Sequence, residues 1–157
     1  MLKYILIFII YLFSSNLVGQ QIIHTETWES GRIKSLSYHK MVDRGMGIEL
    51  FKKVKYEHGR KVSEENYKDG KKEGLYSSWY KSGGKKKEGK YKNNEEVGDW
   101  TEWSSDGKKI REWKYNNDGI PLSDVEYREN GNKFMETIWK DGEWMGRIYY
   151  NEDGSVE

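Results

Sequence analysis

The sequence repeats itself every 24 residues through most of its length, and no other feature constrains the fold as strongly. Glycine occupies one register at Gly59, Gly83, Gly107 and Gly131, and a second at Gly74, Gly98 and Gly146, where Leu122 interrupts it. Lysine and glutamate follow the first register at Lys61, Lys85, Lys109, Lys133, Glu64, Glu88, Glu112 and Glu136. Aromatic residues form two further columns, Tyr67, Tyr91, Tyr115 and Trp139, and Trp79, Trp103 and Tyr127.

Turn sequences divide each unit into halves of about 12 residues. Asp, Asn and Gly, which supply the positive-φ residues of tight turns, cluster at 68–70, 92–94, 117–119, 140–142, 81–83, 105–107, 129–131 and 151–154. The segments between them are rich in Tyr, Trp, Val, Ile and Thr, which is typical of strands. A half-unit is too short for a strand and a crossover helix, so successive strands pair antiparallel. We therefore predict an all-β fold, a single elongated antiparallel meander of β-hairpin repeats.

The first twenty residues, 1–20, have the pattern of a cleaved signal peptide. Lys3 precedes an unbroken apolar or aromatic run from Tyr4 to Phe13, and the small polar residues Ser14 and Ser15 end it. Because a membrane-spanning helix needs about 20 apolar residues, retention as an anchor is the less favoured alternative. We expect cleavage near Gly19 and an exported protein, periplasmic or secreted. The chain has no cysteine, which excludes a lipid-anchored cysteine, disulfides and thiolate catalysis.

The mature chain divides into two parts by the quality of its repeat. Residues 58–157 carry the regular hairpin repeats, and 21–57 read as a degenerate N-terminal repeat or cap, as terminal units of a repeat stack commonly are. Within this cap, Ile33 to Tyr38 and Ile48 to Tyr56 are expected strands. The segment from Met41 to Gly47 reads as an insertion in the turn between them.

The composition predicts a polar sheet covered by aromatic rings. Mean hydropathy is −1.00, yet 15% of the residues are aromatic. Trp79 lies three residues after Tyr76 and Trp103 three after Trp100, so rings fall on both faces unless a bulge intervenes. The stems of Lys and Glu side chains would cover these rings. We interpret the Lys and Glu columns as solvated charges paired across strands; the alternative is an acidic stripe that binds cations or a basic partner.

Charge and motif content argue against several functional classes. Lys3 is the only charged residue of the first twenty, so the remainder carries 26 positive and 26 negative side chains, which gives no basis for binding nucleic acid or a membrane surface. His24, His39 and His58 are not at metal-ligand spacing, and neither a nucleophile elbow nor a phosphate-binding loop is present. We therefore predict a protein that is not an enzyme, with no catalytic residue, metal site or cofactor.

A short motif links the chain to a known repeat. Aromatic-x-Asp-Gly-x3-Gly followed by an aromatic pair occurs in residues Tyr67 to Tyr80 and Trp139 to Tyr150. It resembles the MORN-type repeat, and more closely the variant repeat of bacterial proteins often described as antitoxin-like components. The resemblance covers 56–154 and implies a meandering sheet of hairpins that acts as a scaffold or binding surface.

Two functions are consistent with these features. The first is an exported protein-interaction scaffold, with immunity against an exported toxin as a special case. The alternative is a module that binds carbohydrate or cell wall through stacked rings. The candidate binding residues are the two aromatic columns, Tyr67, Tyr91, Tyr115, Trp139, Trp79, Trp103 and Tyr127; the alternative role for each of them is packing. An open sheet also exposes its last strand, Arg147 to Tyr150, to dimerisation or strand addition.

Overall fold

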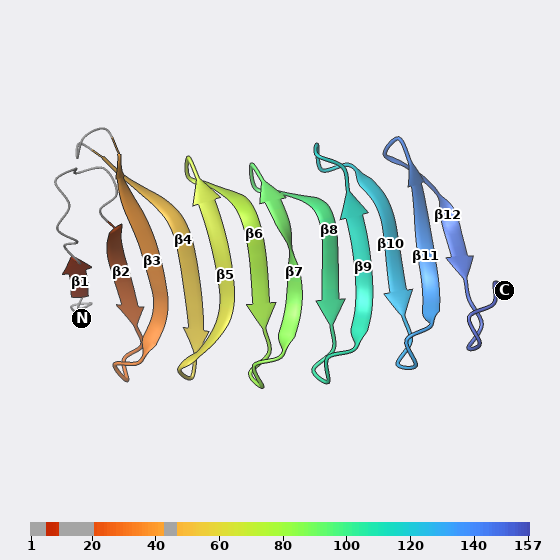
Figure 1. Cartoon of the computed structure of the whole chain (residues 1–157), viewed down its shortest axis with the longest axis horizontal. Helices are drawn as coiled ribbons and strands as arrows, with labels where there is room; N and C mark the ends of the chain where they lie inside the picture. The colour runs from red at the N-terminus through yellow and green to blue at the C-terminus, as the bar shows by residue number, and fades with distance from the viewer. Residues whose placement is uncertain (1–5, 10–20, 43–46) are drawn as a thin grey trace.

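The computed structural model describes residues 6–9, 21–42 and 47–157, and every regular element in these ranges is a β-strand. In chain order the strands are β1 (Leu6–Ile9), β2 (Gln21–Thr27), β3 (Ile33–Val42), β4 (Gly47–Glu57), β5 (Arg60–Lys68), β6 (Lys71–Trp79), β7 (Lys85–Lys92), β8 (Glu95–Trp103), β9 (Lys109–Tyr115), β10 (Pro121–Tyr127), β11 (Lys133–Lys140) and β12 (Glu143–Tyr149). They form one 12-stranded sheet whose spatial order is the chain order, as Figure 1 shows. The predicted all-β antiparallel meander is confirmed.

Of the expectations for the N-terminal part of the chain, the described residues bear on the strands and the insertion of the cap. Strand β1 falls inside the segment predicted to be a signal peptide and pairs with β2; the rest of that segment lies outside the described residues. Both strands expected in the cap are present and longer than expected. Met41 and Val42 continue β3 and pair with Ile48 and Gly47, so only 43–46, also outside the described residues, remain of the expected insertion.

The hairpin turns form at the residues for which the sequence predicted them. Four two-residue turns have positive φ at both positions, which type I′ geometry requires, at His58–Gly59, Asp69–Gly70, Asn93–Asn94 and Asp141–Gly142. The last three of these turns lie at one end of the sheet, together with the longer turn at 116–120. His58–Gly59 lies at the other end, where the remaining turns are longer. The N–H of Gly83 donates to the Tyr80 carbonyl at 2.9 Å, and Gly83 adopts a φ of 96° that β-branched or bulky residues rarely take. Turn chemistry therefore sets the 12-residue half-period.

A β-bulge recurs once in every unit near the start of its first strand. At this point one residue of the bulged strand has no partner on the preceding strand. These residues are Lys34, Val62, Lys86, Ile110 and Phe134. A second irregularity of the strand pairing recurs near Gly74, Gly98, Leu122 and Gly146. Because a bulge shifts the alternation of side chains by one residue, it brings residues three apart onto one face. Lys61 and Glu64 lie on the same face because of this shift.

The core of this one-layer sheet is an aromatic cluster on the central strands. Trp100 is only 1% exposed, although no second layer covers it in the described part of the chain. Its indole stacks on that of Trp113 at 5.8 Å between ring centroids and meets the rings of Tyr91 and Tyr76 edge-on or tilted at 5.0 and 5.8 Å. Gly89 lies directly beneath Trp100, where a Cβ atom would come within 2.0 Å of the indole. The absence of a side chain at Gly89 is what lets Trp100 lie flat against the sheet.

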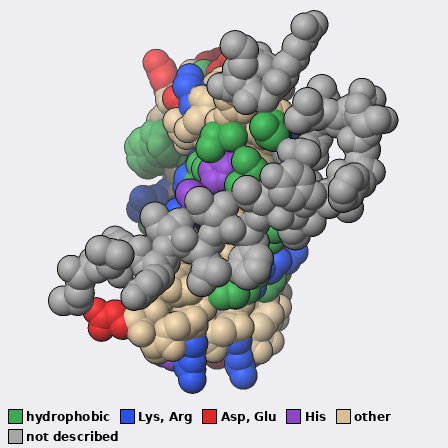
Figure 2. Space-filling view, turned by 90° about the vertical axis from the view of Figure 1, so that its left-hand side faces the viewer, with side chains coloured by type: hydrophobic (Ala, Val, Ile, Leu, Met, Phe, Trp, Pro, Cys, Tyr) green, Lys and Arg blue, Asp and Glu red, His purple; other side chains and the backbone are tan. Residues whose placement is uncertain are grey.

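The N-terminal edge has a smaller cluster of its own. Figure 2 shows this edge, with histidine and hydrophobic side chains gathered near its middle. The rings of His24 and His39 meet edge-to-face at 5.8 Å across β2 and β3. The three histidines are far apart in the sequence, but the register of β2 and β3 brings His24 and His39 close together in space.

Substitution of Gly89 tests the central cluster. We expect Gly89→Ala to lower the free energy of unfolding by about 1–3 kcal/mol, because the new methyl group forces Trp100 off the sheet. The matched control is Gly84→Ala, where the nearest atom would lie 3.7 Å from the added Cβ. We expect a change within about 0.5 kcal/mol for the control. Equal effects of the two substitutions in urea unfolding would contradict this description of the core.

Candidate functional site

The two aromatic columns lie on opposite faces of the sheet, so the structure does not bring the seven candidate residues together. Directly opposed residues share a face, and the register therefore assigns each column. Tyr67, Tyr91, Tyr115 and Trp139 lie on the face that carries Trp100, which we call the cluster face. Trp79, Trp103 and Tyr127 lie on the other, which we call the ladder face. All seven side chains are half-buried, and the expectation of rings on both faces is confirmed.

The glutamate column forms a straight row across the ladder face. Each glutamate lies opposite a residue of the intervening strand, so the row runs Glu64, Ser77, Glu88, Thr101, Glu112, Val125 and Glu136. Neighbouring glutamates are therefore two strands apart, or about 10 Å. At that distance exposed charges are largely screened from one another at physiological salt.

A second row runs beside the first and alternates aromatic residues with lysines. Its members are Tyr56, Lys61, Trp79, Lys85, Trp103, Lys109, Tyr127, Lys133 and Tyr150. The ammonium of Lys61 lies 4.1 Å from the ring centroid of Trp79, and the later lysines lie 5.7, 5.6 and 5.3 Å from the rings of Trp103, Tyr127 and Tyr150. These are cation–π distances.

Each lysine of the second row also pairs with the glutamate three residues later. The ammonium to carboxylate distance is 2.9 Å for Lys61 and Glu64, 2.6 Å for Lys109 and Glu112 and 2.7 Å for Lys133 and Glu136; Lys85 and Glu88 form the fourth pair. We expected pairs across strands, and the cross-strand pair of Lys52 with Glu64 is one. The repeated pair runs instead along one strand, because the bulge between lysine and glutamate aligns them. Lysine, glutamate and aromatic residue thus form one unit, and four such units form the ladder.

The ladder orders side chains more than it stabilises the sheet. Exposed ion pairs contribute about 0–1 kcal/mol and exposed cation–π contacts about 0.5–1 kcal/mol. Lys133 donates a hydrogen bond to Glu136 that lowers the pKa of this carboxyl group, and Tyr150 adds a second hydrogen bond at 2.9 Å. Partial burial raises the pKa of Glu64, but the lysine contacts outweigh it and leave a net lowering. These carboxylates therefore stay charged at neutral pH.

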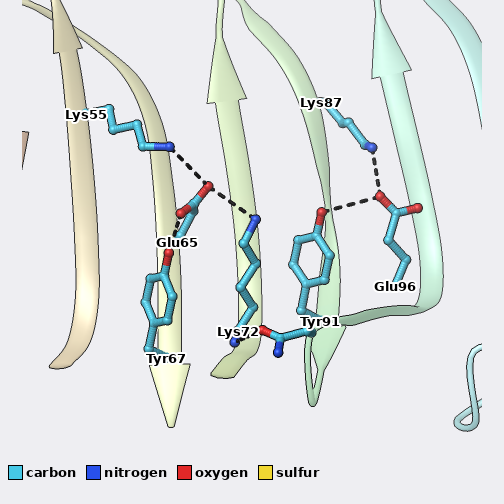
Figure 3. A network of polar contacts seen from close by, with 8 residues as sticks. Lys55, Glu65, Tyr67, Lys72, Lys87, Tyr91 and Glu96 are labelled. Carbon is cyan, nitrogen blue, oxygen red and sulfur yellow. Dashed lines mark hydrogen bonds and ion pairs between the residues drawn. The ribbon is translucent and has the colours of Figure 1, made fainter. Parts of the chain in front are cut away.

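The cluster face carries polar networks as well as rings, and Figure 3 shows two of them. Glu65 accepts a hydrogen bond from the Tyr67 hydroxyl at 2.6 Å and lies 3.7 and 3.5 Å from the ammonium groups of Lys55 and Lys72. Burial alone would raise the pKa of Glu65, but these three groups lower it overall. The pKa of Tyr67 is raised, by burial first and then by Glu65.

The second network holds the aromatic cluster in place. Glu96 accepts hydrogen bonds from Lys87 at 2.9 Å, from the Tyr91 hydroxyl at 3.4 Å and from the indole N–H of Trp113 at 3.0 Å. Lys87 also lies 4.4 Å from the ring centroid of Trp100. The half-buried Tyr91 therefore serves the packing of this face, which favours the packing role for its column.

The 24-residue pattern does not identify two residues that are central to these faces. Tyr150 completes the fourth ladder unit but lies 23 residues after Tyr127, so a strict 24-residue step misses it. Gly89 lies outside both glycine registers, yet a lone glycine inside a strand is a known sign of close approach by another group.

The described surface has open depressions. No group of three or more His, Asp or Glu side chains suited to a metal ion occurs in the described ranges. An open depression is lined by Glu95, Glu96, Tyr115, Asp118 and Gly119. Burial and the charge of Glu96 raise the pKa of Tyr115 there. In residues 6–9, 21–42 and 47–157, no helix is long and apolar enough to cross a membrane.

Comparison with known proteins assigns no family. No protein-family model and none of the curated proteins matches the chain. Among solved structures, the chain is similar to a protein of unknown function from Bacteroides fragilis, with 13% identity, 88% of each chain covered and a TM-score of 0.27. A score that low carries no argument, and the resemblance to the MORN-type repeat stays a prediction.

Titration of Tyr127 tests the contact between ring and carboxylate in the ladder. Burial, together with the hydrogen bond to Glu112 and its charge, raises the pKa of Tyr127 from 10.0 to about 12. The folded protein thus holds this proton more tightly than the unfolded chain. The resulting contribution to stability is complete below pH 10 and is lost as the pH rises to about 12.

We expect Glu112→Gln to shift the titration of Tyr127 downward, because the substitution removes the neighbouring charge. The measurement is tyrosinate absorbance against pH, with the signal of Tyr127 isolated by subtracting a Tyr127→Phe background. Glu88→Gln is the matched control, since Glu88 occupies the same ladder position beside Trp103. A Tyr127 midpoint that both substitutions leave unchanged would contradict the assigned contact.

Proposed function

We propose that the protein, once exported, is a non-catalytic scaffold that binds another protein across the ladder face. The observation that carries the proposal is the ladder itself, four Lys–Glu–aromatic units in a straight series on a face that no other described element covers. Tyr and Trp are preferred anchors of protein interfaces, and rings already ordered by a neighbouring lysine lose little conformational entropy on binding. Immunity against an exported toxin would be one case of such a scaffold.

The contacts of the rings favour a protein partner over a glycan. A sugar binds an aromatic residue by lying on the free face of its ring. In the ladder the ammonium groups of Lys61, Lys85 and Lys109 already lie over the rings of their units. A protein partner can instead approach the ring edges and add its own charged groups to the exposed lysines and glutamates. Electrostatic complementarity of that kind supports specific recognition by a surface that is neutral overall.

Charge reversal on the ladder tests the proposal. We expect the folded chain to capture one stoichiometric protein from envelope or secreted fractions of its source. The double variant Lys85→Glu and Lys109→Glu should weaken that capture about tenfold or more, since each change replaces a positive group of the ladder with a negative one beside Glu88 or Glu112. The matched control reverses Lys71 and Lys140, two exposed lysines outside the ladder, and should leave capture unchanged.

Circular dichroism of both variants checks that the sheet is intact. Equal capture by the ladder variant and the control variant would contradict a binding role for this face. Retention of the folded chain on the cell-wall fraction, with no protein partner, would transfer the proposal to the carbohydrate alternative.

A further inference from the structure

An open depression near the start of the regular repeats is lined by two buried serines of the cluster face. Ser63 and Ser78 lie directly opposite each other on β5 and β6, and they are only 8% and 9% exposed. The depression has a volume of about 630 Å³, which is within the range of small-ligand sites. Tyr76, Tyr80 and Lys86 also line it.

The repeat shows that these two serines replace a pair of charged residues. The positions 24 residues later hold Lys87 opposite Glu102, and those of the following unit hold Arg111 opposite Glu126. The register places all of them in one row of the cluster face with Ser63 and Ser78. Two later units thus carry a carboxylate where the unit of the depression carries the small hydroxyl group of Ser78.

Two polar groups that line the depression lack a polar partner. The hydroxyl of Ser63 forms no hydrogen bond, which is rare for a buried polar group. A serine side chain can turn between its staggered positions, so this hydroxyl can meet a ligand in the depression. The ammonium group of Lys86 lies 5.7 Å from the ring centroid of Tyr80, and no described carboxylate pairs with it. Glu57, which also lines the depression, lies 3.9 Å from Lys81 instead.

The wall of the depression at Tyr80 is ordered by the chain itself. The Tyr80 hydroxyl donates a hydrogen bond to the Trp103 carbonyl at 2.7 Å, and its N–H donates to the Gly84 carbonyl at 2.8 Å. These contacts fix both the ring and the backbone of Tyr80. A ligand therefore meets a surface that needs little ordering, which lowers the entropic cost of binding.

We propose that this depression binds the carboxylate group of a ligand, at the place where Glu102 and Glu126 supply a carboxylate in the next two units. Lys86 provides the positive charge, and the hydroxyls of Ser63 and Ser78 donate hydrogen bonds to the carboxylate oxygens. The site uses none of the lysines or glutamates of the ladder, so it goes beyond the proposed function.

An NMR titration of the full chain with sodium acetate tests the site, with sodium chloride at the same ionic strength as the reference. We expect saturable shifts of the amide signals of Ser63, Ser78 and Lys86, with millimolar affinity because one carboxylate makes few contacts. Shifts that do not saturate, that chloride reproduces, or that lie away from the depression would overturn the proposal.

A capped peptide with one central glutamate identifies the source of the carboxylate, because it presents the same group on a protein segment. Tighter binding of this peptide than of acetate would assign the ligand to an acidic side chain of a partner protein. Equal or weaker binding would assign it to a free carboxylic acid. Failure of both probes to bind would overturn the proposal.

Ser78→Glu restores the repeat and supplies the carboxylate from the chain itself. We expect this substitution to weaken acetate binding about tenfold or more, because the new side chain occupies the site. Ser37→Glu is the matched control, since Ser37 is a half-buried serine of the same face and lies opposite Lys53. The control should leave acetate binding unchanged. Equal effects of the two substitutions would contradict the assigned site.

Lys86→Met tests the charge without adding a group to the depression. The methionine keeps an apolar stem near Tyr80, and loss of the ammonium group should weaken acetate binding about tenfold or more. Lys90→Met, at an exposed lysine of the same strand, is the control and should bind as the unmodified chain does. Circular dichroism checks that each variant retains the sheet. Undiminished acetate binding by folded Lys86→Met would overturn the proposal.

Discussion

A sheet without a second layer has to remove its rings from water with side chains that come from its own strands. In the described part of this protein that requirement is met most fully at Trp100, which lies flat over Gly89 with Tyr76, Tyr91 and Trp113 around it. Each of the four rings comes from a different strand, so the cluster joins β6 to β9 laterally. The described strands further out have smaller ring contacts, such as that of His24 with His39, and also depend on the centre through their neighbours, as in other repeat proteins.

The repeated bulge connects this architecture to the proposed function. Without the extra residue at Val62 and its equivalents, Lys61 and Glu64 would point to opposite faces. With it, lysine, glutamate and ring meet on the ladder face in every unit, while the aromatic cluster occupies the other face. Both faces bury hydrophobic side chains, since Val54 and Val125 are buried in the glutamate row. Among the described strands the unit of ring and charges is repeated four times on the ladder face, and this repetition is why we propose binding there.

Much of the fold could be predicted because its signals are local. The turn at Asp69–Gly70 and its equivalents, the strand composition and the 24-residue period all lie within short stretches of sequence. The candidate site was less accessible. A bulge is a property of two paired strands, so the alignment of Lys61 with Glu64 could not be derived from one strand alone. The burial of Trp100 likewise depends on neighbours from three other strands. Gly89, a lone glycine inside a strand, was the one local sign in the sequence that a large side chain lies close to the backbone.

Residue-level hydrogen exchange in dilute solution tests most directly whether the sheet is held from its centre. We expect amide protection to be greatest in β6 to β9 and to fall progressively toward β2 and β12, because each strand pairs with its neighbours and the aromatic cluster lies centrally. Uniform protection across the sheet, or a maximum at either edge, would contradict it.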